Sequence, residues 1–378
     1  MPIRIFWCQP MGVMDYRLPF FEKAGKAFDV TFLFHERGPV AHKLNGTYSS
    51  GISRIRINRL RLSLLGATDL RTMYSSVRGC NVFVSSFIWN SYTLVGLVLC
   101  KLFHKKVIVW EESFCVVFYP EFGARVLYTL VRLICRGINA FFVPGEVQKS
   151  FLLRLGVEAR SVFVANDYPG RIYSEVLPRE IQLPFNETAS IVMYMGRLVE
   201  MKGVEYLIRA FGIVEKQREN AALLIVGYGP LREHLETLAK SLGIKRIHFA
   251  GDIPDVHVRS YLLRKSSMVV VPSIFTKTGQ RNEGGPVVVL EALSAGKPVV
   301  GSDAVGAVLP FIKDGVNGYR VPQRDVEALA DRIMRLLDAP IPSERVLSTF
   351  REIKGHDNQA DQLQKAVSYC LGRSTLNK

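Results

Sequence analysis

The sequence predicts an α/β protein with two domains, each built on a parallel β-sheet that is covered by helices. Its 378 residues are too many for one ordinary domain and suit two. With 48% hydrophobic residues, both domains can bury a substantial core. Short apolar runs alternate with longer amphipathic stretches, which is typical of strand–helix repeats. Runs such as MVVVP and LLIVG are those of strands buried on both faces.

The expected elements divide evenly between the two halves of the chain. In the first half the predicted strands are 3–8, 30–34, 82–85, 107–110 and 140–143. In the second half they are 191–195, 222–226, 247–250, 268–271 and 298–301. Amphipathic patterns predict helices over 18–27, 126–136, 204–216, 231–242 and 326–337.

A linker is expected near the middle of the chain. Residues 177–190, LPREIQLPFNETAS, hold two prolines and several polar residues and interrupt the alternation. The predicted domains are therefore residues 1–178 and 188–342, with residues 343–378 forming one or two helices without a sheet of their own. Two such halves predict a cleft between them, and ligands bind at the carboxyl ends of parallel strands.

The six cysteines form no CxxC pair, and PIRIFWC at the start is typical of a strand and not of a secretory signal. Free thiols in a reducing, cytoplasmic compartment are expected. The longest apolar run, 92–103, is interrupted by Lys101 and is shorter than the roughly 20 residues of a bilayer span. A core helix is favoured there over a membrane segment.

The net charge of +15 is concentrated in the first half, where residues 1–170 carry 21 Lys and Arg against 11 Asp and Glu. This imbalance indicates an anionic partner such as nucleic acid, phosphates or a membrane, or else only a basic surface. No known nucleic-acid-binding motif is present, so no nucleic-acid partner is expected.

Two cations follow the first strand of the second half. In YMGRLVEMKG, the strand ends at Gly196, and Arg197 and Lys202 then lie in a loop before a helix. Such a pair at the carboxyl end of a parallel strand suits an anion, and a solvated basic loop is the alternative. In LLIVGYGP, Gly227 and Gly229 favour close backbone approach to a ligand, or equally a tight turn.

The stretch RNEGGPVVVLEALSAGKP places Glu291 within an apolar segment. Pro286 suits a first helical turn and Gly296 the far end, so a short buried helix is favoured over a strand. A buried carboxylate needs partners, since an unsatisfied polar group costs about 1–3 kcal/mol. These partners are a protein cation or the hydroxyls of a ligand.

Taken together, these motifs resemble the retaining glycosyltransferases of the GT4 family, which have the GT-B fold of two Rossmann-like domains facing a central cleft. The resemblance rests on G-R-x-x-x-x-K-G, G-x-G-P, P-S, E-G-x-P-x-x-x-x-E-A-x-x-x-G-x-P-V-V and DGVNGYRVP, in this order through residues 190–325. The first half resembles the acceptor-side domain of bacterial polysaccharide glycosyltransferases more loosely, and the C-terminal helices would cross back onto it.

The resemblance implies a role for each motif residue. Arg197 and Lys202 would hold the donor diphosphate, and Glu291 would accept hydrogen bonds from the ribose. Glu283 would face the donor sugar. The remaining donor-site residues are expected to be Gly12, Gly196, Gly227, Gly229, Gly284, Gly285 and Pro286, with Ile253 beside the nucleobase.

Two departures from the family pattern lie in the first half. The first loop reads QPMGVMDYR, with Gly12 alone where many members have two glycines. After the strand ending at Trp110, many members have a histidine, whereas this chain reads WEES. Glu111 or Glu112 would take that place, and a solvated turn or helix cap is the alternative.

The expected reaction moves a sugar from a nucleoside diphosphate sugar, UDP being favoured over GDP, to a glycan or lipid-linked acceptor with retention of configuration. No Asp-x-Asp motif occurs, so neither metal nor cofactor is expected. Two arginine-rich apolar stretches, 52–79 and 124–137, suggest peripheral binding to the inner face of an anionic plasma membrane. Domain helices with snorkelling arginines are the favoured alternative.

Three rival functions stay open. They are another GT-B reaction such as sugar-nucleotide epimerisation or inverting transfer, a non-catalytic sugar-nucleotide binder, and a nucleic-acid-binding protein.

Overall fold

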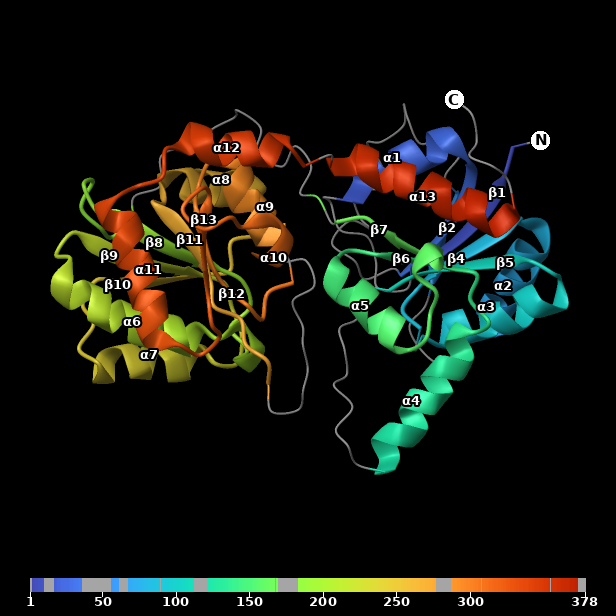
Figure 1. Cartoon of the computed structure of the whole chain (residues 1–378), viewed down its shortest axis with the longest axis horizontal. Helices are drawn as coiled ribbons and strands as arrows, with labels where there is room; N and C mark the ends of the chain where they lie inside the picture. Colours follow the sequence, from blue (N-terminus) through green and yellow to red (C-terminus); the bar gives the residue numbers. More distant parts are fainter. Residues whose placement is uncertain are drawn as a thin grey trace. The chain divides into compact units, whose positions relative to one another are not determined.

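The computed structural model is described over most of the chain, and every structural statement below concerns that part. The described residues are 2–9, 17–35, 56–60, 67–88, 90–111, 122–166, 168, 183–276, 287–306, 308–353 and 355–372. They form two compact units, one containing β1–β7 with α1–α5 and α13, the other β8–β13 with α6–α12 (Figure 1).

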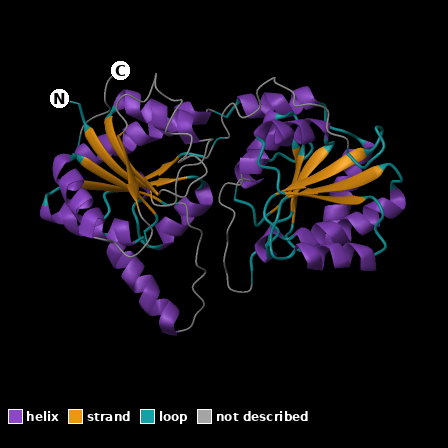
Figure 2. Cartoon of the chain, turned by 180° about the vertical axis from the view of Figure 1, so that it is seen from behind, coloured by secondary structure: helices purple, strands orange, loops and turns teal. Residues whose placement is uncertain are grey.

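The first unit is a seven-stranded parallel sheet in the order β3-β2-β1-β4-β5-β6-β7. Its strands are β1 (Arg4–Gln9), β2 (Asp29–His35), β3 (Arg56–Leu60), β4 (Val82–Ser86), β5 (Lys106–Trp110), β6 (Ala140–Val143) and β7 (Val162–Val164). Its helices are α1 (Leu18–Ala27), α2 (Ala67–Gly79), α3 (Ser91–Leu102), α4 (Phe122–Cys135), α5 (Glu146–Arg154) and α13 (Gly355–Leu371). Figure 2 shows helices on both faces of this sheet.

An aromatic cluster forms the core between this sheet and helices α1 and α13. Trp7 is fully buried and packs against Phe20, Phe32 and Trp110 with ring centroids 5.5–5.8 Å apart. Leu363 and Val367 of α13 join the same cluster. The last helix of the chain is thus part of the core of the first unit.

The second unit is a six-stranded parallel sheet in the order β10-β9-β8-β11-β12-β13. Its strands are β8 (Ser190–Met195), β9 (Ala221–Val226), β10 (Ile247–Gly251), β11 (Met268–Val271), β12 (Val299–Ser302) and β13 (Gly318–Val321). Its helices are α6 (Val204–Gln217), α7 (Arg232–Ser241), α8 (Val256–Lys265), α9 (Val287–Ser294), α10 (Val308–Phe311), α11 (Val326–Asp338) and α12 (Ser343–Arg351).

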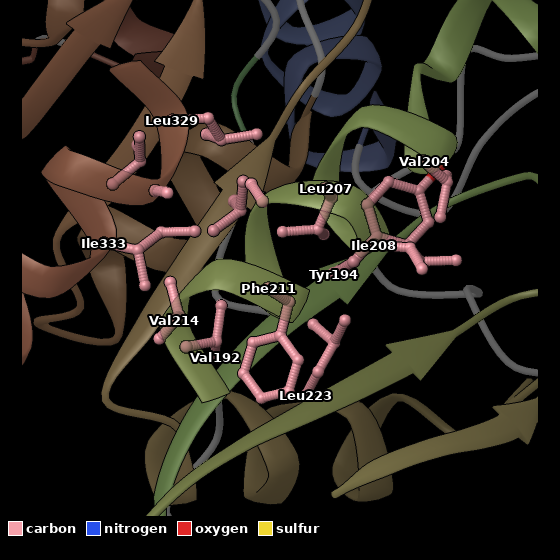
Figure 3. Packing of buried hydrophobic residues seen from close by; sticks show 14 of the residues in the cluster. Val192, Tyr194, Val204, Leu207, Ile208, Phe211, Val214, Leu223, Leu329 and Ile333 are labelled. Carbon is pink, nitrogen blue, oxygen red and sulfur yellow. The ribbon is translucent and has the colours of Figure 1, made fainter. Parts of the chain in front are cut away.

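The core of the second unit lies on both faces of its sheet. On one face, Leu207 and Phe211 of α6 pack toward Val192 and Leu223, as Figure 3 shows. Leu329 and Ile333 of α11 complete that layer. Helices α8 and α9 cover the other face, so the central strands are buried on both faces.

All ten strands predicted from sequence are present within a residue or two of the expected bounds, as are four of the five predicted helices. The fifth, predicted over 126–136, is α4, which begins four residues earlier at Phe122. Three short or irregular strands were not anticipated: β3, β7 and β13. The interpretation of residues 52–79 as arginine-bearing helix was partly wrong, because Arg56 and Arg59 lie on β3, and α2 begins only at Ala67.

The interpretation of 92–103 as a core helix was half right. Residues 91–102 form α3, but only one face is buried, and Val98 is 69% exposed. Five cysteines are free and buried, and Cys115 lies outside the described residues. No helix in the described ranges is both long enough and apolar enough to cross a bilayer.

Candidate functional site

The candidate site lies in the second unit, where the central strands end. Strand β8 pairs with β9 on one side and β11 on the other, so the loops that follow these three strands meet at one edge of the sheet. The carboxyl edge of a parallel sheet is where ligands of such folds bind. Arg197 and Lys202 both belong to the loop after β8.

Hydrogen bonds on three sides fix the backbone around Arg197. The Tyr194 hydroxyl donates to the Arg197 carbonyl at 2.8 Å. The next residue, Leu198, donates its N–H to the Tyr228 carbonyl at 2.8 Å and accepts from the Leu231 N–H at 3.1 Å. Arg197 therefore extends from a loop held to both its own strand and the loop after β9.

The two glycines after β9 permit this close approach. A Cβ on Gly227 would lie 1.8 Å from the Gly196 carbonyl oxygen, and one on Gly229 would lie 2.3 Å from that of Leu198. Gly227 also has a φ of +141°, a conformation that favours glycine. The chain's own backbone thus requires both glycines, as in the tight-turn alternative, and their contact with a ligand stays a prediction.

Lys202 lies in a turn that is held against the loop after β11. A Cβ on Gly203, which has a φ of +62°, would lie 2.1 Å from the Pro272 carbonyl oxygen. The Ile274 N–H donates to the Met201 carbonyl at 2.8 Å. Together these contacts join the loops after β8 and β11 into one backbone assembly.

The electrostatics of Lys202 indicate an anion-binding position. Burial, and to a lesser extent the positive charge of Arg197, together lower the pKa of Lys202 to about 8. Arg197 itself is exposed. A bound anion would offset both effects, because it neutralises the repulsion and favours the charged ammonium.

Glu291 lies in helix α9, as predicted. Val289, Leu290, Ala292 and Leu293 are buried around it, and Glu291 itself is only 9% exposed. Its carbonyl accepts from the Ala295 N–H at 3.0 Å, so the helical pattern continues past it. The expectation of a carboxylate within a buried apolar helix is confirmed.

Sequence reasoning missed a clamp on the loop after β11. The Phe275 N–H donates to Gln323 Oε1 at 2.7 Å, and the guanidinium of Arg324 donates to the Phe275 carbonyl. Asp303 Oδ1 in turn accepts from the Gln323 N–H at 2.9 Å. Arg324 has a φ of +65°, which is uncommon for a residue other than glycine. The only signal was the position of Gln323 and Arg324 directly after DGVNGYRVP.

Ile253 follows β10 at the same edge of the sheet. Arg259 Nη1 donates to the Ile253 carbonyl at 2.9 Å, and Asp255 caps helix α8 by accepting from the His257 N–H at 2.7 Å. The Gly251 carbonyl accepts from the Gly227 N–H at 2.7 Å. The structure therefore brings Ile253 to the edge that carries Arg197, while its nucleobase contact stays a prediction.

Glu111 lies in the first unit and is fully buried. Its Oε2 accepts from the Ile88 N–H at 2.8 Å, and its own N–H donates to the Phe142 carbonyl at 2.9 Å. This carboxylate therefore caps a turn before α3 and is not solvated.

Six other predicted residues lie outside the described residues: Gly12, Glu112, Glu283, Gly284, Gly285 and Pro286.

Two further features bear on the chemistry of the second unit. A cavity of about 500 Å³ lies at the opposite edge of its sheet, where β8, β9 and β10 begin, and is lined in part by Asn186, Asn220 and Lys245. Among the residues that the structure describes, no group of three or more His, Cys, Asp or Glu side chains could hold a metal ion. Metal independence stays a prediction.

Solved structures with the same architecture identify the fold. Anabaena HepE in complex with UDP aligns with a TM-score of 0.74 at 15% identity, over 97% of this chain and 100% of that one. Sucrose-phosphate synthase from Thermosynechococcus elongatus aligns with a TM-score of 0.74 at 19% identity, over 98% of this chain and 100% of that one. The chain has the α/β GT-B fold of such glycosyltransferase structures.

Sequence comparison finds similarity to known glycosyltransferases over the second unit. Residues 179–350 match the family model described as "Glycosyl transferases group 1". An uncharacterized glycosyltransferase of Methanocaldococcus jannaschii is 36% identical over 50% of this chain and 44% of its own length. Alpha-D-kanosaminyltransferase of Streptomyces kanamyceticus is 33% identical over 41% of this chain and 38% of its own length. The chain thus matches less than half the length of these curated relatives.

The glycine contacts generate a stability prediction. Replacing Gly227 by Ala should destabilise the protein by roughly 3 kcal/mol or more, since it adds a backbone clash to a strained φ. Gly243→Ala is the matched control, because Gly243 has a φ of +69° and open space around its Cβ position. It should cost about 1–2 kcal/mol in urea unfolding. Equal losses in the two variants would contradict this account of Gly227.

Proposed function

We propose that this protein is a retaining glycosyltransferase of the GT4 family that transfers a sugar from a nucleoside diphosphate sugar to an acceptor hydroxyl. The observation that carries the proposal is the pairing of Arg197 with a half-buried Lys202 whose pKa is lowered to about 8. Two cations held together at the carboxyl edge of a parallel sheet match a diphosphate. The group 1 family match over residues 179–350 supports the same function.

In this proposal Arg197 and Lys202 neutralise the charge that develops on the leaving diphosphate, so no metal is needed. Glu291 accepts hydrogen bonds from the ribose hydroxyls of the nucleotide. Ile253 packs beside the nucleobase. The clamp from Gln323 and Arg324 fixes the loop that leads toward the sugar-binding segment.

At the sugar end, Glu283 faces the donor sugar, with Gly284, Gly285 and Pro286 near the phosphates and Gly12 contributed by the first loop. The acceptor attacks from the face that the diphosphate leaves, and the departing phosphate assists deprotonation. Burial of Glu111 and its bond to the Ile88 N–H favour a structural role for that residue. We therefore assign the sugar contact in place of the family histidine to Glu112.

We assign UDP as the nucleotide and surface polysaccharide synthesis as the setting, with a lipid-linked or growing glycan as acceptor. HepE, a neighbour in fold, has been crystallised with UDP and with UDP-glucose. Relatives include the lipopolysaccharide 1,2-N-acetylglucosaminetransferase of Salmonella typhimurium, 30% identical over 48% of each chain. An acceptor in a membrane would place this enzyme on the cytoplasmic face as a peripheral protein.

The test begins with a thermal-shift screen of UDP- and GDP-sugars, because a ligand that binds the folded state raises the unfolding midpoint. The nucleotide sugar that binds is then prepared with a radiolabel in its sugar and incubated with the protein and a glycolipid extract as acceptor. We expect labelled product with an α-linkage. If the donor is epimerised and no sugar is transferred, the protein is an epimerase and not a transferase. A β-linked product would exclude retention of the anomeric configuration.

The two glutamates are predicted to differ in effect. Glu291→Ala should weaken UDP binding about tenfold to a hundredfold, since hydrogen bonds to a charged group contribute about 1.5–3 kcal/mol. Glu283→Ala should lower kcat while leaving the Kd for UDP nearly unchanged. Calorimetric titration and initial rates measure both, with Glu291→Gln as a control that keeps an acceptor. An unchanged Kd in Glu291→Ala would remove the ribose assignment.

Lys202 gives a pH prediction. The pKa of Lys202 is about 8 in the unbound protein, and a bound diphosphate must raise it. Above pH 8, Lys202 therefore keeps its proton in the complex and loses it in the unbound protein. UDP affinity should therefore fall by up to about tenfold per pH unit above 8, until the pKa of the complex is reached. In Lys202→Arg, which stays charged, this decline should disappear. Equal wild-type affinity at neutral and alkaline pH would refute the role of Lys202.

A further inference from the structure

Large apolar side chains are exposed in unusual number on one helical layer of the first unit. On α3, Val98 is 69%, Leu102 64% and Leu94 39% exposed. On α4, Leu130 and Leu133 are 51% and 52% exposed. We call these five residues, with Leu70 and Tyr74 of α2, the α2–α4 surface. Contiguous exposed apolar side chains of this kind indicate a binding surface.

Helices α2 and α3 lie side by side in the first unit, and α4 projects outward with its C-terminal end near α3 (Figure 1). The rings of Tyr74 on α2 and Phe103 at the end of α3 are 5.2 Å apart. A Cβ on Gly137, just beyond α4, would lie 3.7 Å from Leu97 Cδ2 of α3. The exposed side chains of α2 and α3 thus belong to one helical pair, and those of α4 lie on a helix that meets this pair at its C-terminal end.

The charges of this layer are almost all positive, because the sequences of α2, α3 and α4 hold one carboxylate, Asp69 near the start of α2. Residues 70–110 and 122–145 contain no Asp or Glu at all. Five cations in these ranges are exposed: Arg71, Arg78, Lys101, Arg132 and Arg136. The layer therefore combines protruding aliphatic side chains with positive charge that no neighbouring carboxylate in these segments offsets.

We propose that the α2–α4 surface docks on an anionic lipid bilayer, with Leu94, Val98 and Leu102 entering the interface. The lysine and arginine heads then lie at the level of the lipid phosphates. This inference deepens the peripheral location in the proposed function by naming the surface that makes contact. The apolar side chains of α3 are essential to it, because cations alone would give only weak, salt-sensitive adsorption.

A bilayer fits this surface better than a second copy of the chain. Pairing two copies through it would bring two predominantly basic faces together, and like charges across an interface are unfavourable. Anionic lipid instead supplies both a neutralising charge and an apolar interior to the same surface.

The experiment measures co-sedimentation of the full chain with vesicles of phosphatidylcholine alone and of phosphatidylcholine mixed with phosphatidylglycerol. Wild type should bind the anionic vesicles and bind the neutral ones much less. The double variant Val98→Ser/Leu102→Ser should lower the partition coefficient by about tenfold or more, because it removes most of the inserted apolar surface. Lys101→Glu should lower the partition coefficient severalfold, and by a larger factor at low than at high salt, because salt screens the attraction to the lipid.

Matched controls lie in the second unit, on helix α7 and at its end. Leu242→Ser changes a 38% exposed leucine, and Lys240→Glu changes an exposed lysine. Both should bind vesicles as wild type does. Thermal unfolding checks that each variant is folded, which is expected because the altered side chains are exposed. The thermal shift with UDP-sugars, measured on the same samples, should be the same in all of them.

Failure of the wild type to bind anionic vesicles, or undiminished binding by the Val98/Leu102 variant, would overturn the inference. A wild-type dimer that the same variant converts to monomer would also overturn it, since a second copy would then cover the surface. Loss of the response to UDP-sugars in the wild type would count against the proposed function and not against this surface.

Discussion

The second unit depends on one constraint, the close approach of the backbone loops that follow β8, β9 and β11. Gly227 and Gly203 have backbone carbonyl oxygens of neighbouring loops where any other residue would have a Cβ. Glycine at these positions lets three loops share one edge without side chains between them. Arg197 and Lys202 owe their proximity to this packing, so backbone sterics determine the electrostatics of the site.

That proximity is unfavourable for the unbound protein. Lys202 has a depressed pKa because burial and the charge of Arg197 both oppose its protonation. An anion should bind such a site more tightly than it binds two separate surface cations. The bound anion removes the repulsion between Arg197 and Lys202 and also forms new bonds with them. This relief is the physical reason why the proposed function places a diphosphate beside Arg197 and Lys202.

The sequence predicted most of the regular structure because its signals are local. Runs of β-branched residues identified ten strands, and the apolar pattern around Glu291 identified α9. Strand β3 was missed because its arginines hide the apolar pattern, and β13 because Gly318 and Arg320 interrupt it. The clamp between Gln323 and Phe275 joins residues 48 positions apart, and no local pattern encodes such a contact.

The same distinction explains which site residues were understood correctly. Burial of Glu291 follows from its immediate neighbours, so it could be predicted. The role of Glu111 depends on Ile88, and that of Gly229 on Leu198, both of which become neighbours only in the folded chain. A carboxylate that caps a buried turn and one that contacts a sugar have the same sequence signal. The fold therefore settles the role of Glu111 through a contact that its neighbours in the sequence do not reveal.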